Sequence, residues 1–458
     1  MTGGLKLTII GGGAFRTPRL VYGLIRHAAE LNVRQIDLYD PDFSRMEALL
    51  AVSRHVAAKM GSALVFNPRR SLPEAVAGAD FVFLTYRIGG EAARALDERC
   101  ALDSGVLGQE TVGPGGFFMA LRSIPVTLDY VQRIREIAPD AWIINFTNPA
   151  GIVTEAVHQA GDSRFVGVCD TPYHLQMEIA EYLGVTTDAL EVEVAGLNHL
   201  GWFTKITHQG VDMLPKLLNE LPQVLQAIRP LSFFTAEEIQ RFASLPTEYV
   251  YFYLHAREVV LRTQDRPSRG EIIQASMQSF FPELQQLVAQ GAIDEAWRLY
   301  GQVITGRSNS YLANETGSAF PRGLNPDSLF NSEGYEGIAI RLMEGLMGEQ
   351  RSRTVINVPS HGLLPEIGAD AVIECACEVE HQKIKPVPLT SRVAPWCLAL
   401  IKETKQFELA TVKAANSRRI DDSAVALAQH PILDGDQEKA WQIVRQRSQL
   451  PEAPRWVS

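Results

Sequence analysis

The chain has 458 residues, of which 46% are hydrophobic and 21% charged, a composition typical of a globular protein large enough for two packed domains. This composition excludes intrinsically disordered and fibrous proteins. The formal net charge of −10 disfavours a nucleic-acid-binding protein or a basic membrane anchor, while a local basic pocket for a small anion stays compatible with it.

The N-terminus and the cysteines favour a cytoplasmic protein. Residues 1–4 lead straight into a predicted strand, so we expect no signal peptide, and no apolar run reaches the roughly 18 residues that span a membrane. The five cysteines are odd in number and lack the spacing of a disulfide framework, so we expect reduced thiols. Neither a nucleic acid nor a membrane is an expected partner.

A predicted strand at 5–10 is followed by a glycine turn and by a helix that begins near Thr17. This order is the context of a dinucleotide-binding turn, because glycines let backbone N–H groups approach a pyrophosphate at a helix N-terminus. The third glycine of the G-x-G-x-x-G pattern is absent, so the motif is weak by itself. The candidate cofactor-binding residues of the turn are Gly11, Gly12, Gly13, Ala14 and Phe15.

A second predicted strand at 35–39 ends in Asp40, at the place where a carboxylate holds the ribose of a dinucleotide. The alternative is that Asp40 belongs to a solvated turn that caps the next helix. Further strands at 63–66 and 80–85 alternate with helical segments such as 45–59. The pattern predicts an α/β protein with a doubly wound, Rossmann-like parallel sheet.

Polar residues follow two more of these strands. Arg87 comes after the strand at 80–85, where it fits an anionic group of cofactor or substrate, or equally a surface salt bridge. Asn145 and Asn148 end the strand that starts at 141 and offer amides to hydroxyl groups, Asn145 as a cofactor ligand and Asn148 as a substrate ligand. Between them, the glycine-rich stretch 108–116 is either a ligand-contacting loop or a plain structural one.

Cys169 and His199 each lie just after an apolar run, at 165–168 and 192–197. Ligands bind beyond the carboxyl ends of strands in open α/β sheets. A thiolate and an imidazole at two such ends could hold one divalent metal ion, although a lone cysteine or histidine is more often a structural residue.

Beyond residue 200 the alternation of strand and helix breaks down. Helical patterns cover 213–229, 236–243, 274–300 and 396–429, and strands are predicted at 354–359 and 371–375. We therefore divide the chain into an NAD-binding Rossmann-like domain at 1–199 and a mainly helical α+β lobe at 200–458, which would carry substrate, metal-site and oligomer contacts.

Five motifs in order resemble the signature of glycoside hydrolase family 4, and its 6-phospho-glucosidases are the nearest in pattern. The motifs are Gly11-Gly12-Gly13 with Thr17-Pro18, Gly108-Gln109-Glu110-Thr111 with Gly113-Pro114-Gly115-Gly116, Asn145-Phe146-Thr147-Asn148-Pro149-Ala150, Cys169-Asp170-Thr171-Pro172 and Gly196-Leu197-Asn198-His199. Together they are far more specific than any one of them.

The resemblance implies an enzyme that uses NAD and a divalent metal, typically manganese, and that cleaves glycosides by oxidation and elimination instead of with two carboxylates. By motif, Cys169 and His199 match the metal ligands, Tyr249 the base that removes the C2 proton, and Asp170 the acid of the α-specific members. A tyrosine pKa near ~10 is too high for this task, so nearby positive charge must lower it. The family also implies a homodimer or homotetramer.

The expected substrate is an anionic glycoside, with Arg16 and Arg87 as candidate ligands of its C6 phosphate. A sulfonate or a carboxylate at C6 is an alternative. Asp170 slightly favours α- over β-glucosides, yet Thr171 departs from the usual hydrophobic residue. Two other functional classes stay open: an NAD-dependent 2-hydroxy-acid dehydrogenase, and a sensor that binds NAD and a phosphosugar without turnover.

Overall fold

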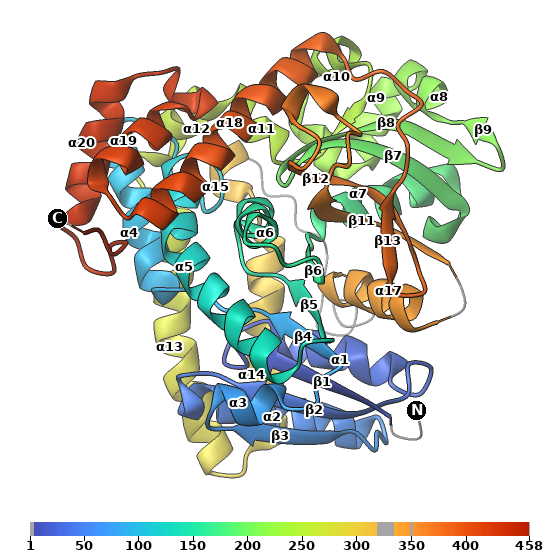
Figure 1. Ribbon diagram of the computed structural model, residues 1–458, viewed down its shortest axis with the longest axis vertical. Coiled ribbons are helices and arrows are strands. Elements are labelled where there is room, and N and C mark those ends of the chain that lie inside the picture. Colours follow the sequence, from blue (N-terminus) through green and yellow to red (C-terminus); the bar gives the residue numbers. More distant parts are fainter. Residues whose placement is uncertain (1–3, 318–333, 349–350, 458) are drawn as a thin grey trace.

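A nine-stranded sheet organises the protein. The computed structural model describes residues 4–317, 334–348 and 351–457 (Figure 1). Six strands of the sheet are parallel and lie in the order 3-2-1-4-5-6, the arrangement of dinucleotide-binding folds. They are β1 (Leu5–Ile10), β2 (Val33–Tyr39), β3 (Val65–Arg69), β4 (Phe81–Leu84), β5 (Trp142–Asn145) and β6 (Phe165–Gly167). The predicted doubly wound parallel sheet is confirmed.

The C-terminal half completes this sheet with three antiparallel strands. They are β11 (Ser352–Pro359), β12 (Val372–Glu380) and β13 (Lys383–Pro386). β11 joins the parallel strands because Asn357 pairs with Gly167 of β6. The two strands predicted at 354–359 and 371–375 are present, but they extend the first sheet instead of building the second lobe. The domain division at residue 199 stays a prediction, and the sheet contains strands from both sides of it.

A second, smaller antiparallel sheet follows residue 189. It consists of β7 (Leu190–Leu197), β8 (Leu200–His208), β9 (Val211–Asp212) and β10 (Leu245–Pro246). Only Asn198 and His199 separate β7 from β8, and His199 has a φ of 64°. Two-residue hairpin loops favour such left-handed backbone, so the turn itself presents His199.

Helices pack around the two sheets. Those of the first half are α1 (Thr17–His27), α2 (Phe43–Lys59), α3 (Leu72–Val76), α4 (Gly90–Asp103), α5 (Pro114–Ile137), α6 (Ala150–Gln159) and α7 (Thr171–Leu183). Those of the second half are α8 (Leu214–Asn219), α9 (Leu221–Ala227), α10 (Ala236–Phe242), α11 (Val250–Leu254), α12 (Ala256–Thr263), α13 (Arg269–Ala289), α14 (Ile293–Asn309), α15 (Ala313–Thr316), α17 (Tyr335–Met347), α18 (Pro395–Ser417), α19 (Ile420–Ala428) and α20 (Gln437–Ser448).

The chain beyond residue 260 packs back onto the first half. α13 and α14, yellow in Figure 1, contact α2, while α18 and α20, in red, contact α5 and α4. The single helix predicted at 274–300 is wrong: α13 and α14 are separate, because Gly291 adopts a φ of 72° that ends the first of them. The second lobe is mainly helical with an antiparallel sheet, as predicted.

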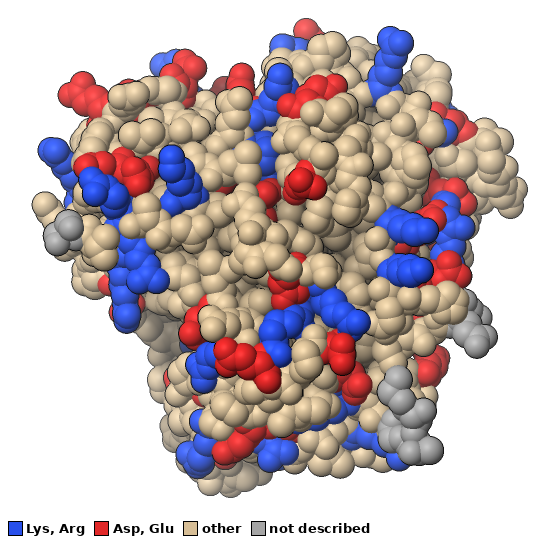
Figure 2. Space-filling view, viewed as in Figure 1, with Lys and Arg blue, Asp and Glu red and all other residues tan. Residues whose placement is uncertain are grey.

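The structure also shows the state of the cysteines, the character of the helices and the distribution of surface charge. All five cysteines are free and buried. Among the described residues, no helix is long and apolar enough to cross a bilayer. Figure 2 shows basic and acidic side chains interspersed on the visible face, unlike the continuous basic stripe of a nucleic-acid-binding surface.

Candidate active site

The predicted site residues converge at the carboxyl edge of the parallel strands. The glycine turn follows β1, Arg87 follows β4, Asn148 follows β5, and Cys169 follows β6. β1 and β4 are neighbours in the sheet although they are separated in the chain, so the strand order reverses between them. Open α/β sheets bind their ligands in the crevice at such a reversal.

The glycine turn is too crowded for any side chain. A Cβ on Gly11, whose φ is 94°, would lie 2.7 Å from the Tyr86 backbone nitrogen, and one on Gly13 would lie 2.9 Å from the Asp40 carboxylate. The N–H of Phe15, just ahead of α1, has no hydrogen-bond partner in the described part of the chain. A free donor at a helix N-terminus, beside backbone without side chains, fits a pyrophosphate.

Asp40 combines the two roles that the sequence left open. Its carboxylate accepts hydrogen bonds from the backbone N–H groups of Gly13 and Asp42, each at 2.9 Å. These bonds brace the glycine turn, and burial raises the pKa of the carboxyl group. Each oxygen accepts one of these bonds and keeps a further acceptor position for a ribose hydroxyl group.

Two predicted cofactor ligands have side chains that are engaged elsewhere. The ring of Phe15 packs against Phe280 and Tyr300, with centroids 5.1 and 5.2 Å away, so only its backbone faces a ligand. The Asn145 amide bonds both the N–H and the carbonyl group of Thr147, at 3.0 Å each, and so shapes the loop after β5. Ligand contacts of both residues stay predictions.

His199 is held as a metal-ligating histidine is held. Its Nδ1 lies 2.8 Å from the Thr111 hydroxyl group, and its ring stacks on Tyr249 with centroids 3.8 Å apart at an angle of 6°. Burial lowers the pKa of His199 to about 4, so the imidazole is neutral at neutral pH. With Nδ1 bonded to Thr111, Nε2 is the nitrogen that can bind a metal ion.

Cys169 lies just ahead of α7 and close to Tyr249, on which the His199 ring stacks. Burial raises the pKa of its thiol, and so do the nearby Glu374 and Asp170 carboxylates, while hydrogen bonds from Thr171 lower it. A bound cation would deprotonate such a thiol. In the described part of the chain, no third His, Cys, Asp or Glu side chain forms a metal-ligating group with Cys169 and His199. Two protein ligands leave positions open for substrate oxygens and water.

Replacing Thr111 with valine is expected to weaken metal binding by about 10- to 100-fold, because outer hydrogen bonds of this kind orient a ligating histidine. The affinity for Mn²⁺ can be measured by isothermal titration. Thr263→Val is a matched control, because the buried Thr263 hydroxyl group donates to the Val259 carbonyl group one turn earlier in α12. An unchanged affinity in Thr111→Val would contradict this role.

The Tyr249 phenol lies among acidic groups. Burial raises its pKa well above the ordinary value, and the Glu110 and Glu248 carboxylates raise it further. Tyr311, which donates to Glu248 at 2.8 Å, also hydrogen-bonds Tyr249. Among the described residues, burial and acidic neighbours therefore dominate this pKa, and they raise it, in place of the positive charge that was expected to lower it.

Asp170 is poised as a carboxylate. His174 lies 3.5 Å and Arg16 3.7 Å from Oδ2 of Asp170. Burial raises the pKa of Asp170, but the His174 hydrogen bond and the charges of His174 and Arg16 outweigh it and lower the pKa overall. Asp170 and the predicted substrate ligand Arg16 thus lie close to each other, next to the candidate metal ligand Cys169.

Arg87 belongs to a buried ion-pair network that anchors the loop at 108–116. Its guanidinium lies 2.6 Å from Glu110 and 3.7 Å from Glu91, and Arg94 holds the other Glu110 oxygen at 2.5 Å. Burial raises the pKa of Glu110, but Arg87 and Arg94 lower it below its ordinary range. The loop is ordered and reaches His199 through Thr111.

Arg307 of α14 is a functional candidate that the sequence did not suggest. Its guanidinium lies 4.7 Å from the Phe15 ring centroid and contacts the Met277 sulfur at 3.6 Å. Burial lowers its pKa to about 9, and the nearby Arg16 and Arg94 lower it too, although Glu91 opposes them. A buried guanidinium whose positive charge is balanced by so little nearby negative charge suits an anionic ligand. No local motif marks it: Arg307 lies in the last turn of α14, beyond the helical pattern predicted at 274–300.

Glu374 of β12 is a second such residue. It accepts hydrogen bonds from the side-chain amides of Asn198, at 3.0 Å, and Asn357, at 3.1 Å. Asn357 also donates to the carbonyl group of Gly167 at 3.3 Å. Through Asn357, one buried carboxyl group thereby connects the turn that carries His199 with β6, the strand that precedes Cys169.

Glu374→Gln is expected to remove a pH-dependent loss of stability. Burial raises the pKa of Glu374 from 4.5 to about 7, so the folded protein keeps a proton that the unfolded chain loses. Stability therefore falls as the pH rises from about 4.5 to 7, by up to about 3 kcal/mol. Urea unfolding at pH 5 and pH 8, with chelator, measures the difference. The exposed Glu380→Gln, on the same strand, is the control; an unchanged slope in Glu374→Gln would contradict the assignment.

Family models and known proteins match nearly the whole chain. The model described as Family 4 glycosyl hydrolase matches residues 6–185, and that of the Family 4 glycosyl hydrolase C-terminal domain matches residues 194–433. The 6-phospho-beta-glucosidase of Escherichia coli (strain K12) is 29% identical over 443 residues, which are 95% of this chain and 92% of the relative.

Two solved structures share the fold. A 6-phospho-alpha-glucosidase from gut microorganisms, in complex with NAD and Mn²⁺, has a TM-score of 0.81 at 23% identity and covers 99% of this chain and 100% of its own. The 6-phospho-beta glucosidase from Thermotoga maritima, with NAD and glucose-6-phosphate, has a TM-score of 0.79 at 23% identity and covers 97% and 99%.

Proposed function

The chain belongs to the family 4 glycosyl hydrolases, and we propose that it hydrolyses 6-phospho-glucosides with NAD and a divalent metal, Mn²⁺ for preference. The observation that carries the proposal is the convergence of Cys169, His199 and Tyr249 beside a glycine turn without room for side chains. Curated relatives and neighbours that act on phosphorylated glucosides support it.

The residues present fit both groups. The turn at Gly11–Gly13 admits backbone close to a pyrophosphate, and Asp40 faces the same turn. Cys169 and neutral His199 are soft and borderline donors that suit a divalent transition metal. When bound, NAD would supply hydride chemistry at the sugar C3, and the metal would act as a Lewis acid that stabilises negative charge on the sugar oxygens.

Tyr249 removes the proton from C2 once C3 is oxidised, because the neighbouring ketone acidifies that proton. Its stacking on His199 would place the phenol near a metal ion held by that histidine. Since burial and the described acidic side chains around Tyr249 raise its pKa, a divalent metal ion held by Cys169 and His199 would supply positive charge that lowers it. Asp170 lies on the Arg16 side of the site; after it takes up a proton in the substrate complex, it donates that proton to the leaving-group oxygen as the bond between C1 and this oxygen breaks.

Arg307, Arg16 and Arg87 hold the C6 phosphate. Arg87 and Arg16 already have carboxylate partners, whereas the pKa of about 9 for Arg307 reflects burial and the Arg16 and Arg94 charges. A phosphate dianion offsets this excess of positive charge.

Arg307→Met is expected to raise KM for a 6-phospho-glucoside by about 10- to 100-fold with a smaller change in kcat, because one charge-assisted hydrogen bond contributes about 1.5–3 kcal/mol. Steady-state kinetics measure both constants. Arg298→Met is the matched control on the same helix, because Arg298 pairs with Glu295 at the surface. An equal KM in both variants would place the phosphate elsewhere.

The proposal is tested by hydrolysis of p-nitrophenyl 6-phospho-α- and 6-phospho-β-glucosides with NAD, Mn²⁺ and a reducing agent. Unphosphorylated, 6-sulfo and uronic-acid glycosides form the rest of the panel. Activity that requires NAD, falls with chelator and prefers the phosphate supports the proposal. Activity indifferent to both NAD and chelator would refute it, and stoichiometric NADH release would indicate a dehydrogenase.

The preferred anomer, the oligomeric state and the cellular compartment of the enzyme can also be proposed. Asp170 slightly favours α-glucosides, and the panel decides between the two anomers. We propose a homodimer or homotetramer, which light scattering after gel filtration measures. Five free, buried cysteines, one of them the metal ligand Cys169, suit the reducing cytoplasm.

A further inference from the structure

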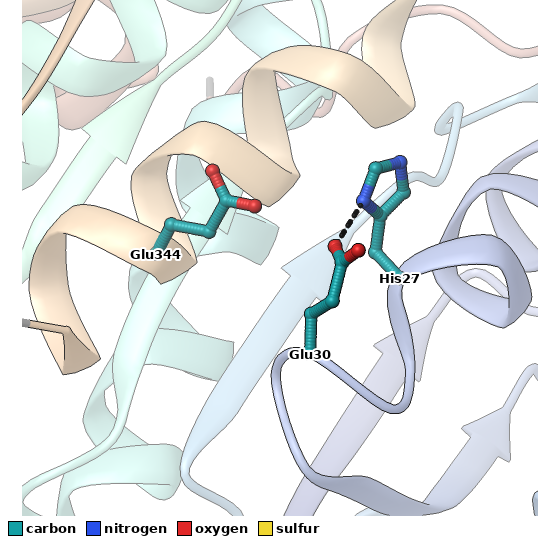
Figure 3. Close-up of side chains that lie close together, drawn as sticks. All are labelled: His27, Glu30 and Glu344. Carbon is teal, nitrogen blue, oxygen red and sulfur yellow. Dashed lines mark hydrogen bonds and ion pairs between the residues drawn. The ribbon is translucent and has the colours of Figure 1, made fainter.

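A group of three possible metal ligands lies away from the active site, where α1 meets α17. His27 is the last residue of α1, Glu30 follows one turn later, and Glu344 belongs to the last turn of α17 (Figure 3). His27 Nδ1 lies 3.0 Å from Glu30 Oε2, and the donor atoms of all three residues lie within 4.8 Å of one another. Figure 3 shows the Glu344 carboxylate pointing from α17 toward the other two.

The charges at this junction are poorly balanced without a cation. The C-termini of α1 and α17 both bring partial negative charge, and two carboxylates are added to it. Burial raises the pKa of Glu344, and the Glu30 and Asp188 carboxylates raise it further, while His27 and Arg341 lower it. The Glu344 carboxylate has no hydrogen bond or ion pair within the described ranges, since the nearby Arg341 binds Asp188 and the Tyr173 hydroxyl group.

The junction also has room for further ligands. A cavity of about 170 Å³ is lined by His27 and Glu344, together with Tyr22, Arg26 and Arg341. Two of the three donors therefore face a space that water can fill. An ion held by three side chains keeps an open position there for water or a small anion.

We propose that His27, Glu30 and Glu344 bind a divalent cation of the Zn²⁺ type. One imidazole nitrogen and two carboxylate oxygens are typical donors for Zn²⁺, and a water molecule from the cavity completes four ligands. Arg19 and Glu336 pair at 3.5 Å between the same two helices. The ion adds a second connection between these helices at the C-terminal end of α1. It therefore fixes α17 against α1, the helix that follows the glycine turn. This site shares no residue with the Cys169 and His199 pair.

The test counts Zn²⁺ in the full-length chain by equilibrium dialysis. The Cys169→Ala/His199→Ala variant, which lacks the catalytic pair, is expected to bind one ion per chain, and Zn²⁺ is expected to raise its melting temperature. Adding His27→Ala or Glu344→Gln is expected to weaken that binding by more than about tenfold. His381→Ala is the matched control, because His381 faces Glu380 at 3.7 Å on the exposed surface without a third ligand in the described residues.

Two outcomes would contradict the proposed site. One is a Zn²⁺ stoichiometry that neither His27→Ala nor Glu344→Gln changes. The other is the absence of a bound ion in the Cys169→Ala/His199→Ala variant. If that variant does not fold, the same substitutions in the otherwise unchanged chain are expected to reduce two bound ions to one. Glycosidase activity is a separate readout: loss of Zn²⁺ at this site with activity retained supports the second site, whatever the substrate proves to be.

Discussion

Tyr249→Phe is expected to lower kcat by about 10²- to 10⁴-fold, which is the usual contribution of a positioned general base. The substitution keeps the ring that stacks on His199 at 3.8 Å and removes only the hydroxyl group. Proton removal from C2 also labels the product, so reaction in D2O with the unchanged protein is expected to place deuterium at C2. The variant is expected to lose hydrolysis and labelling together.

Tyr253→Phe is the matched control for this prediction. Tyr253 lies in α11, whose N-cap is Tyr249, but its ring stacks on His430 instead of on His199. We expect this variant to keep kcat within a few-fold. Normal C2 labelling in the Tyr249→Phe product would show that another group removes the proton.

Asp170→Asn is expected to affect substrates according to their leaving groups. A nitrophenolate leaves without protonation, whereas an alkoxide needs a proton, so alkyl 6-phospho-glucosides are expected to lose about 10²- to 10⁴-fold in kcat/KM and nitrophenyl ones far less. The isosteric amide keeps the shape of the side chain beside Arg16 and His174. A series of glycosides with aglycones of rising pKa measures the dependence.

The charge state of Asp170 makes this test decisive. His174 and Arg16 lower its pKa despite burial, so the carboxylate is charged before substrate binds. A proton donor must take up a proton in the complex, whereas a group that only orients substrate stays charged. Equal losses for aryl and alkyl glycosides would therefore assign Asp170 to substrate orientation.

The order of strands and helices in the first half followed from the chain alone. Apolar runs such as 5–10 and 80–85, separated by helical patterns, are local features, and each run became a strand of the sheet. The strands at one edge of that sheet could not be placed in this way. β11 and β12 were predicted as strands, but their place beside β6 depends on the pairing of Asn357 with Gly167, 190 residues apart in the chain. Local patterns carry no information about such a pairing.

The site divides in the same way. Motifs in the sequence pointed to Gly11–Gly13, Asp40 and Cys169, because each follows a strand of the parallel sheet and such strand ends meet at one edge. His199 was also expected at a strand end of this sheet, and that was wrong: it lies in the turn between β7 and β8 of the second, antiparallel sheet. Tyr249 followed only from the family resemblance, and its stacking on His199 is tertiary.

By itself, therefore, the sequence determined the nucleotide-binding fold, the family, and the residues that lie at strand ends. Only the tertiary structure decided which groups surround these residues. Thr111 hydrogen-bonds the His199 imidazole, Glu374 accepts a hydrogen bond from Asn198 in the same turn, and α14 brings Arg307 close to Arg16. The physical reason is that strand and turn formation depends on neighbouring residues. The charge, pKa and hydrogen bonding of a buried group instead depend on residues that only the folded chain brings within reach.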